Sequence, residues 1–221
     1  MSDIVGSGVY EVIKRAQRHL NLTGKTRSKP GPNSSSHAFQ VTESRNVTIT
    51  IYKWDDRDEA IKLLLGERAL VFIKKEFEEW CSPKLQNPGK AYQFAHNREL
   101  WEQSLNKRFY YTYQERIRTG YDHLLRELAE TPDTRQAFLS IWESLDIRHT
   151  GKERVPCTIG YHFQKEKDKL HCTMVMRSTD VRNCLANDLW LGTSLLERVG
   201  IDLKMKVGEF TIFTSNLHQY L

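Results

Sequence analysis

The spacing of hydrophobic residues changes along the chain between a helical period and a strand period. In residues 10–20, apolar side chains recur every three or four positions opposite a basic side, which predicts an amphipathic helix. In residues 46–53, valine and isoleucine alternate with threonine and tyrosine, which predicts a half-buried strand. Residues 21–36, between these segments, contain several glycines, prolines and serines, and they predict a flexible loop.

The remaining segments predict further helices and strands in one domain. Helical periodicity covers residues 59–80, with a break near Gly66, and also residues 97–105, 113–130 and 189–199. Strands are predicted at residues 137–142, 157–164, 170–177 and 203–213, with a hairpin turn at residues 165–169 and a loop at residues 83–89. This mixture predicts an α+β fold in which helices pack on one large mixed β-sheet.

Composition narrows the class of protein without deciding its function. A chain of 221 residues is long enough for one domain with a substantial core. The 33 Lys and Arg against 28 Asp and Glu give a net charge of +5, which suits an anionic nucleotide or a nucleic acid and decides neither. The four cysteines show no metal-ligand spacing, so we expect a reduced protein without a metal. No secretory signal or long apolar run is present, and we therefore expect a soluble, cytoplasmic protein.

Two short motifs have ordinary structural explanations when each is taken alone. Asp188, in the pair Asn187-Asp188, would be an N-cap for the helix predicted at residues 189–199. Cys157, in Val-Pro-Cys-Thr, would be an inert buried thiol. The segments around these residues decide whether they carry chemistry.

Five segments of the chain match one protein family in the order that the family requires. Residues 72–80 surround Glu76, and residues 121–135 end in Pro-Asp-Thr-Arg. Residues 155–158 contain Cys157, residues 174–190 contain Arg-Ser-x-Asp and Asn-Asp, and residues 207–220 end in His-Gln-Tyr. Together they resemble the thymidylate synthase superfamily, specifically from about residue 71 to residue 221 and only faintly before that.

The resemblance implies the thymidylate synthase fold, in which two subunits pack sheet against sheet as a homodimer. It implies one domain over residues 1–221, with residues 1–45 forming an N-terminal helix and a flexible loop. In the family a further segment follows His-x-Tyr and closes over the folate, whereas this sequence ends at Leu221. We therefore expect folate closure to involve other residues or to be altered.

The resemblance also implies the catalytic groups. Cys157 corresponds to the nucleophile, whose thiolate attacks C6 of a pyrimidine and makes C5 electron-rich, and nearby cations should favour that thiolate. Glu76 corresponds to the general acid/base that helps remove the C5 proton and organises a water, with Glu78 and Glu79 as neighbouring alternatives. Asp180 corresponds to the residue that contacts the pterin, which implies 5,10-methylenetetrahydrofolate as the one-carbon donor.

The implied substrate is a pyrimidine nucleoside monophosphate. Arg135 and Arg177 are expected to clamp its phosphate by bidentate hydrogen bonds, with Arg135 reaching in from the neighbouring subunit. The family has a second arginine after Arg135, and this chain has Gln136 there. The other implied contacts are Ser178 and Arg45 with the phosphate, Arg27 being an alternative to Arg45, and His218 and Tyr220 with the sugar 3′-hydroxyl.

Asp188 bears on which base is read. Thymidylate synthases carry Asn at the corresponding position, whereas the deoxycytidylate 5-hydroxymethylases of phages carry Asp, often as Asn-Asp. Uracil presents an N3–H donor beside an O4 acceptor and suits an amide, while cytosine presents an N4 donor beside an N3 acceptor. A carboxyl group accepts from N4 and, when protonated, donates to N3. A mismatch leaves a buried polar group unpaired, at a cost of roughly 1–3 kcal/mol.

These residues predict folate-dependent C5 hydroxymethylation of dCMP, the chemistry that supplies modified phage DNA. Within the same enzyme class, a dUMP-directed synthase or hydroxymethylase and a CMP hydroxymethylase are alternatives. From another class, the alternative is a non-catalytic protein on the same fold that binds nucleotides or nucleic acid. We favour the enzyme over this last alternative because the nucleophile, the acid/base, the base reader and the sugar contacts are all present.

Overall fold

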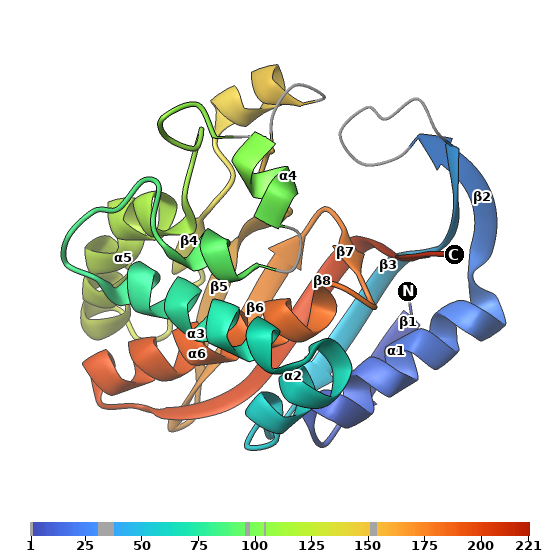
Figure 1. Ribbon diagram of the computed structural model, residues 1–221. Coiled ribbons are helices and arrows are strands. Elements are labelled where there is room, and N and C mark those ends of the chain that lie inside the picture. Colours follow the sequence, from blue (N-terminus) through green and yellow to red (C-terminus); the bar gives the residue numbers. More distant parts are fainter. Residues whose placement is uncertain (1, 31–37, 96–97, 104, 151–153) are drawn as a thin grey trace.

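The computed structural model describes residues 2–30, 38–95, 98–103, 105–150 and 154–221, and it is built on one eight-stranded mixed sheet (Figure 1). The strands follow the order β1(Ser2–Gly6), β3(Ala38–Ile51), β8(Lys206–Tyr220), β6(Lys169–Met176), β5(Thr158–Glu166) and β4(Phe138–Ser140). Two further strands lie off this path, because β2(Lys25–Pro30) pairs with β3 and β7(Thr179–Asp180) pairs with β8. The β1–β3 and β6–β8 pairs are parallel, whereas β3–β8 and β5–β6 are antiparallel. The predicted α+β fold with one large mixed sheet is confirmed.

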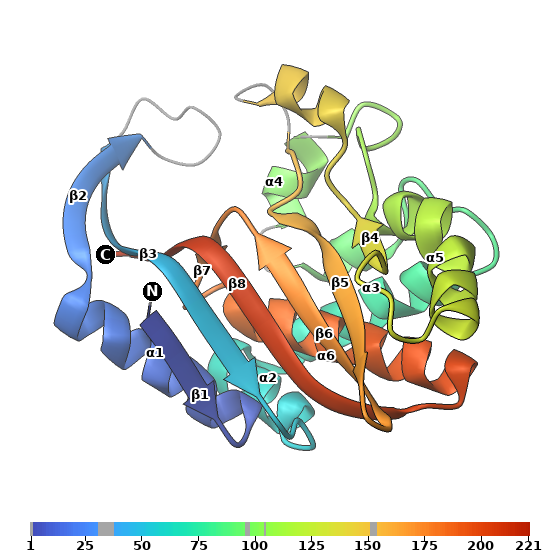
Figure 2. The same cartoon turned by 180° about the vertical axis from the view of Figure 1, so that it is seen from behind.

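Helices cover one face of this sheet, and the opposite face is open in Figure 2. The helices are α1(Val9–Thr23), α2(Arg57–Leu65), α3(Glu67–Cys81), α4(Arg98–Gln103), α5(Tyr113–Glu130) and α6(Leu185–Leu203), with short 3₁₀ turns at Ala91–Phe94 and Ser144–His149. No helix in the described ranges is long and apolar enough to cross a membrane. Alternate residues of the central strands face away from the helices, among them Thr48, Thr173, Val175, Thr211 and Phe213, which are only partly buried.

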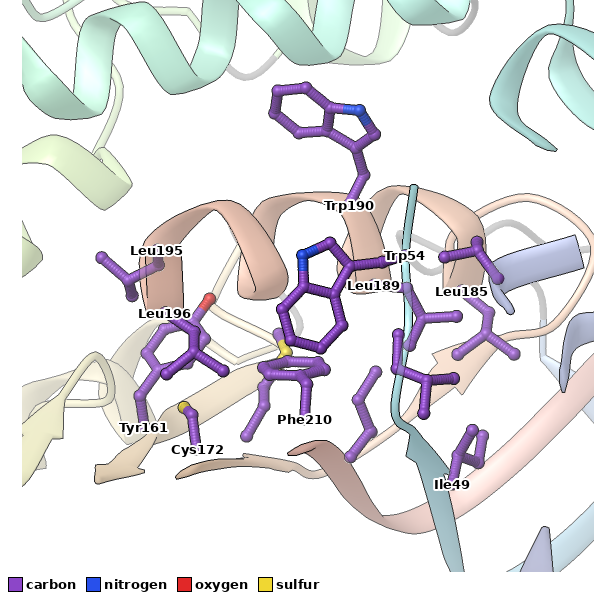
Figure 3. Packing of buried hydrophobic residues seen from close by; sticks show 14 of the residues in the cluster. Ile49, Trp54, Tyr161, Cys172, Leu185, Leu189, Trp190, Leu195, Leu196 and Phe210 are labelled. Atoms are coloured by element: carbon purple, nitrogen blue, oxygen red, sulfur yellow. The ribbon is translucent and has the colours of Figure 1, made fainter. Parts of the chain in front are cut away.

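The core lies between α6 and the sheet. Leu185, Leu189 and Leu196 point from α6 toward the fully buried Phe210 and Ile49 (Figure 3). Trp190 points away from the sheet, and its ring lies 5.9 Å from that of Phe77 on α3. Helix α6 is thus packed on both sides, which fixes the position of its first turn.

Local sequence explains the most accurate helix predictions. Helix α5 begins where Thr112 accepts from the backbone N–H of Glu115 and Glu115 accepts in return, which is a capping box. The predicted break near Gly66 is confirmed, since Gly66 has φ of 89° between α2 and α3. The helix predicted at residues 10–20 is also confirmed and extends to Thr23.

The prediction for the first 45 residues was partly wrong. Residues 21–23 continue α1, and residues 25–30 of the predicted loop form β2, while residues 31–36 lie outside the described part. β2 is polar because it is an edge strand, and its hydrogen bonds come from backbone pairing with residues 38–43 of β3. β1 was not predicted, although it pairs with residues 47–51 in parallel.

Three further boundaries differ from the prediction. β8 continues to Tyr220, beyond the predicted end at residue 213, because it pairs with the extended start of β3. β4 ends at Ser140, since the N–H groups of both Ile141 and Trp142 donate to the carbonyl of Ile159. Helix α6 begins at Leu185, so Asp188 lies inside its first turn, and the N-cap explanation of Asp188 is wrong.

A buried ion pair ties α5 to the segment before β5. Arg116 is 7% exposed and donates at 2.8 Å to Asp146, which is fully buried, and Glu143 completes the cluster. The Arg116 guanidinium also lies over the rings of Tyr110 and Tyr111, at 5.9 and 5.7 Å. The pair therefore positions the tyrosine segment that precedes α5.

We predict that Asp146→Ala destabilises the protein by about 3–5 kcal/mol, because it removes the fully buried partner of the buried Arg116 charge. Glu143→Gln is the matched control, since Glu143 is 54% exposed, and should cost less than about 1 kcal/mol. Urea unfolding followed by circular dichroism measures both values. Equal losses of unfolding free energy in the two variants would show that the buried Arg116–Asp146 pair stabilises the protein no more than the exposed Glu143 contact does.

Candidate active site

The predicted site residues lie at the ends of strands that the sheet places side by side. β7 runs parallel to β8, with Thr179 opposite Leu217 and Asp180 opposite His218. The N–H of Val181 also donates to the carbonyl of His218 at 2.8 Å. This pairing brings the Arg-Ser-x-Asp motif beside His-x-Tyr, and the turn after β7 leads directly into α6.

Cys157 precedes β5 and is held against Arg177. The N–H of Arg177 donates to the Cys157 carbonyl at 2.9 Å, and its Nε donates to the Pro156 carbonyl at 3.0 Å. Cys157 is partly buried, and Arg177 is exposed with an Nη1–Ser178 Oγ distance of 3.4 Å. The structure therefore places Cys157, Arg177 and Ser178 together.

Glu76 enters the same region from α3. Its Oε1 accepts from Trp80 Nε1 at 3.1 Å. Burial raises the pKa of Glu76 to about 7, against the lowering effects of the Trp80 hydrogen bond and the Arg154 charge. Of the two alternatives, Glu78 is exposed, and Glu79 accepts from the backbone N–H groups of Lys90 and Ala91.

Asp188 is the second carboxyl group with a strongly altered pKa. It is partly buried in the first turn of α6, and its Oδ2 accepts from the Thr179 hydroxyl at 2.6 Å. Burial raises the pKa of Asp188 to about 7; the Thr179 hydrogen bond opposes this rise, and the negative charge of Asp180 adds to it. Next to it, the Oδ1 of Asn187 is buried and has no hydrogen-bond partner in the described part of the chain.

Two tyrosines connect these groups electrostatically. Burial raises the pKa of Tyr111, which also feels the charges of Arg154, Cys157, Glu76 and Arg177. Burial likewise raises the pKa of Tyr220, which feels the charges of Asp180, Cys184 and Cys157. Because charge effects of this kind act over short distances, Tyr111 is near both Cys157 and Glu76, and Tyr220 is near both Cys157 and Asp180.

Of the predicted phosphate ligands, Arg135 lies away from this cluster. Arg135 is exposed after α5, where its carbonyl is 3.2 Å from the His162 ring. That contact is five residues along β5 from Cys157, or about 16 Å, so Arg135 does not reach Cys157 of its own chain. Arg45 is exposed on β3 opposite Asn216. Its alternative, Arg27, is 3.5 Å from the Glu43 carboxylate.

Asp180 has a structural role that the sequence did not indicate. It is 6% exposed, and its Oδ1 accepts from the N–H groups of Arg182 and Asn183 at 2.9 and 3.3 Å. Its Oδ2 accepts from the Asn183 side chain at 2.7 Å. The carboxylate thus holds the turn before α6, which limits its capacity to contact a cofactor.

An aromatic pocket beside Glu76 was missed by the sequence analysis. Trp80 stacks on Tyr113 with centroids 5.1 Å apart, and Arg154 lies 3.5 Å from the Trp101 ring centroid. The pocket also contains Tyr92, Phe109, Tyr110 and Tyr111. These residues come from segments far apart in sequence, and the only sequence signal was the aromatic cluster at residues 109–113. Such walls fit a flat conjugated ring.

Metal chemistry has no apparent ligand set in the described ranges, where no group of three or more His, Cys, Asp or Glu side chains is arranged to hold an ion. The groups placed in the site are a thiol, a cation, and two carboxyl groups whose pKa values burial raises to about 7.

Comparisons with known proteins match this site and fold. A putative thymidylate synthase from Methanosarcina barkeri is 28% identical over 118 residues, which cover 51% of this chain and 54% of that protein. A deoxyuridylate hydroxymethyltransferase from Bacillus phage SP01 is 29% identical over 125 residues, covering 55% of this chain and 31% of that protein. The matched region thus spans about half, or less, of these curated relatives.

A solved structure and a family model extend the match. The thermostable thymidylate synthase A from Bacillus subtilis superposes with a TM-score of 0.57 and 13% identity, covering 96% of this chain and 80% of that one. The family model described as thymidylate synthase matches residues 43–221. On the strength of this match, the chain belongs to the thymidylate synthase family.

Proposed function

We propose that this chain hydroxymethylates C5 of deoxycytidylate through a cysteine adduct at C6. The observation that carries the proposal is Asp188, a partly buried carboxyl group whose pKa is about 7. Near neutral pH such a group exists both as an acid and as a carboxylate. Its protonated form accepts from the cytosine N4 amine through one oxygen and donates to N3 through the other. An amide in this place would match uracil instead.

Cys157 is the proposed nucleophile. Its thiolate forms a bond to C6 of the base, and the C5–C6 π electrons move to C5, which becomes nucleophilic. Arg177 is held against the carbonyl oxygens of the cysteine loop. Its positive charge is available to bind the substrate phosphate together with Ser178. The sulfur is released when the substituted C5 regains its double bond to C6.

Glu76 is the proposed proton carrier. A group whose pKa is close to the operating pH exchanges protons efficiently, and the pKa of Glu76 is about 7. Trp80 donates to one carboxyl oxygen, which leaves the other for the C5 proton or for a water molecule. The hydroxyl group of the product would come from a water that Glu76 orients.

The family uses 5,10-methylenetetrahydrofolate, which when bound supplies a one-carbon unit at the oxidation level of formaldehyde. The aromatic pocket formed by Trp80, Trp101, Phe109 and their neighbours fits the flat rings of such a group and lies beside Glu76. Asp180 contributes less than the resemblance implied, because its oxygens already accept hydrogen bonds from Arg182 and Asn183.

The remaining polar groups complete the proposed nucleotide site. His218 and Tyr220 extend from β8 beside β7 and are assigned to the sugar 3′-hydroxyl. The buried Oδ1 of Asn187 is an acceptor that a donor on the substrate would satisfy. Arg45, exposed on β3 opposite Asn216, is assigned to the phosphate.

A dUMP-directed hydroxymethyltransferase is the second candidate. It is favoured by the similarity to the SP01 phage protein, which carries that name. Both candidates use the same nucleophile and proton carrier. They differ in the base, cytosine or uracil, that pairs with Asp188. The choice between them is therefore a question about one side chain.

We also propose a homodimer in which the open face of the sheet is the contact. Phe213 and Val175 lie on that face among threonines and are only partly buried. Arg135, exposed and about 16 Å along β5 from Cys157 of its own chain, is then available to the phosphate in the partner's site.

Product analysis tests the proposed reaction. The protein is incubated with methylenetetrahydrofolate and either dCMP or dUMP, and the products are identified by mass spectrometry. We expect 5-hydroxymethyl-dCMP, and its formation should fall by at least ~10³-fold in Cys157→Ala while the exposed-thiol control Cys81→Ser retains activity. A methyl product, or hydroxymethylation of dUMP alone, would contradict the proposal.

Asp188→Asn should move the preference from dCMP toward dUMP. An amide that turns its NH₂ group toward O4 and its oxygen toward N3–H pairs with uracil, and the Thr179 hydroxyl can then accept from the NH₂ group, so dCMP should lose about 10–100-fold in kcat/KM relative to dUMP. Steady-state kinetics with both nucleotides measures this ratio. An unchanged ratio would remove Asp188 from the role of base reader.

Mixing inactive subunits tests the role of Arg135. Arg135→Ala and Cys157→Ala proteins should each be inactive, and a mixture that exchanges subunits should recover about a quarter of the wild-type activity, since half of the dimers then contain one intact site. Arg126→Ala, which removes another exposed arginine near the end of α5, should be active by itself. No recovery in the mixture would show that Arg135 does not serve the neighbouring site.

A further inference from the structure

Thr179, the variable residue of the Arg-Ser-x-Asp motif, makes a contact that its position in the motif did not suggest. It is 2% exposed on β7, and its hydroxyl donates to Asp188 Oδ2 at 2.6 Å. No other side-chain hydrogen bond to the Asp188 carboxyl group is found among the described residues. Thr179 is therefore the neighbour that decides how this carboxyl group is presented.

Both ends of the Thr179–Asp188 contact are fixed by backbone structure. Thr179 is paired with Leu217 in β8, and the next turn is held by the hydrogen bond from Val181 to His218. Asp188 belongs to α6, where its N–H donates to the carbonyl of Cys184 at 2.9 Å. Since a strand and a packed helix carry the two groups, the hydrogen bond is preorganised before any substrate arrives.

The other titratable groups near Asp188 do not compete for the same role. Asp180 on β7 acts on Asp188 through its negative charge. The buried Tyr161 hydroxyl on β5 and the Cys184 thiol at the start of α6 both feel the charge of Asp188. None of these groups donates a hydrogen bond to Asp188 in the described structure.

We propose that Thr179 is a specificity-determining residue, which holds Asp188 Oδ2 as a hydrogen-bond acceptor and thereby keeps the carboxyl proton on Oδ1. This inference rests on the proposed function, because it concerns how Asp188 reads the base. Thr179 acts through Asp188 and is thus a positioning residue.

The fixed arrangement discriminates between the two bases. An Oδ2 that accepts from Thr179 can accept a second hydrogen bond from the cytosine N4 amine, since each carboxylate oxygen has two lone pairs. The proton on Oδ1 then meets the N3 lone pair. Uracil in the same pose would set O4 against an accepting Oδ2 and N3–H against the Oδ1 proton. Uracil can donate its N3–H only when the proton has left Oδ1, and its O4 then still faces Oδ2, which the Thr179 hydroxyl holds as an acceptor.

The hydroxyl also sets the pH at which the arrangement works. The Thr179 hydrogen bond lowers the pKa of Asp188, while burial raises it to about 7. Because pairing with cytosine needs the protonated form, activity on dCMP should decline as the pH rises above about 7. Without the hydroxyl the pKa of Asp188 rises further, and this alkaline decline should move to higher pH.

The decisive experiment compares Thr179→Val, Thr179→Ser and the wild type with dCMP and dUMP over a range of pH. In Thr179→Val we expect the ratio of kcat/KM for dCMP to that for dUMP to fall about tenfold, and the alkaline decline to move upward. Thr179→Ser, which keeps the hydroxyl, should restore both values. Thr193→Val is the matched control, because Thr193 is a buried threonine on α6 whose hydroxyl donates to the Leu189 carbonyl instead.

The outcomes separate this inference from the proposed function. A wild type without activity on dCMP would overturn the proposed function itself. A wild type that prefers dCMP, with Thr179→Val unchanged in base ratio and pH profile, would overturn only the role of Thr179. If Thr179→Val does not fold, Thr179→Ala serves as a second hydroxyl deletion. In addition, the ¹³C-labelled Asp188 carboxyl group is titrated by NMR, and its pKa must be the same in the wild type and in Thr179→Ser. A pKa that differs between these two proteins would also overturn the inference.

Discussion

The partial burial of two carboxyl groups is the constraint on which this site depends. Burial raises the pKa values of both Glu76 and Asp188 to about 7. If water reached either group freely, its pKa would return toward 4 and the group would be an ordinary anion at neutral pH. Glu76 could then no longer exchange protons near neutrality, and Asp188 could no longer donate to N3 of a base.

The fold produces this burial through layered packing. Helix α6 lies on the sheet and carries Asp188 in its first turn, while α3 packs on α6 through Phe77 and Trp190. The stacked rings of Trp80 and Tyr113 then cover the region beside Glu76. Farther out, the buried Arg116–Asp146 pair holds the tyrosine segment in place. Stability and site electrostatics are therefore produced by the same contacts.

The sequence was sufficient where the structural signal is local or belongs to a family motif. Helix α5 was predicted with its observed bounds, with Thr131-Pro132 marking its end, and the structure shows a capping box at its start. The motifs around Cys157, Arg177 and His218 were found through their order along the chain. Their proximity follows from the parallel pairing of β7 with β8, a two-residue strand without any pattern of its own.

The sequence was insufficient where the contacts join distant segments. The polar strand β2 was predicted as a loop, because its partner and not its composition makes it a strand. Asp188 alone suggested an N-cap, since its contact with Thr179 depends on where α6 begins. The aromatic pocket joins residues from α3, α4 and the segment before α5, together with Arg154. In our proposal Arg135 acts in the site of a second subunit, and no pattern within one chain indicates where that subunit lies.

Proton uptake on nucleotide binding is the measurement that tests the central claim most directly. Calorimetric titrations near pH 8, in two buffers that differ in ionisation enthalpy, give the number of protons taken up with dCMP and with dUMP. If Asp188 titrates near pH 7 and pairs with cytosine in its protonated form, dCMP should take up about one proton more per site than dUMP. The difference should disappear in Asp188→Asn. Equal proton uptake by the two nucleotides in the wild type would contradict the account.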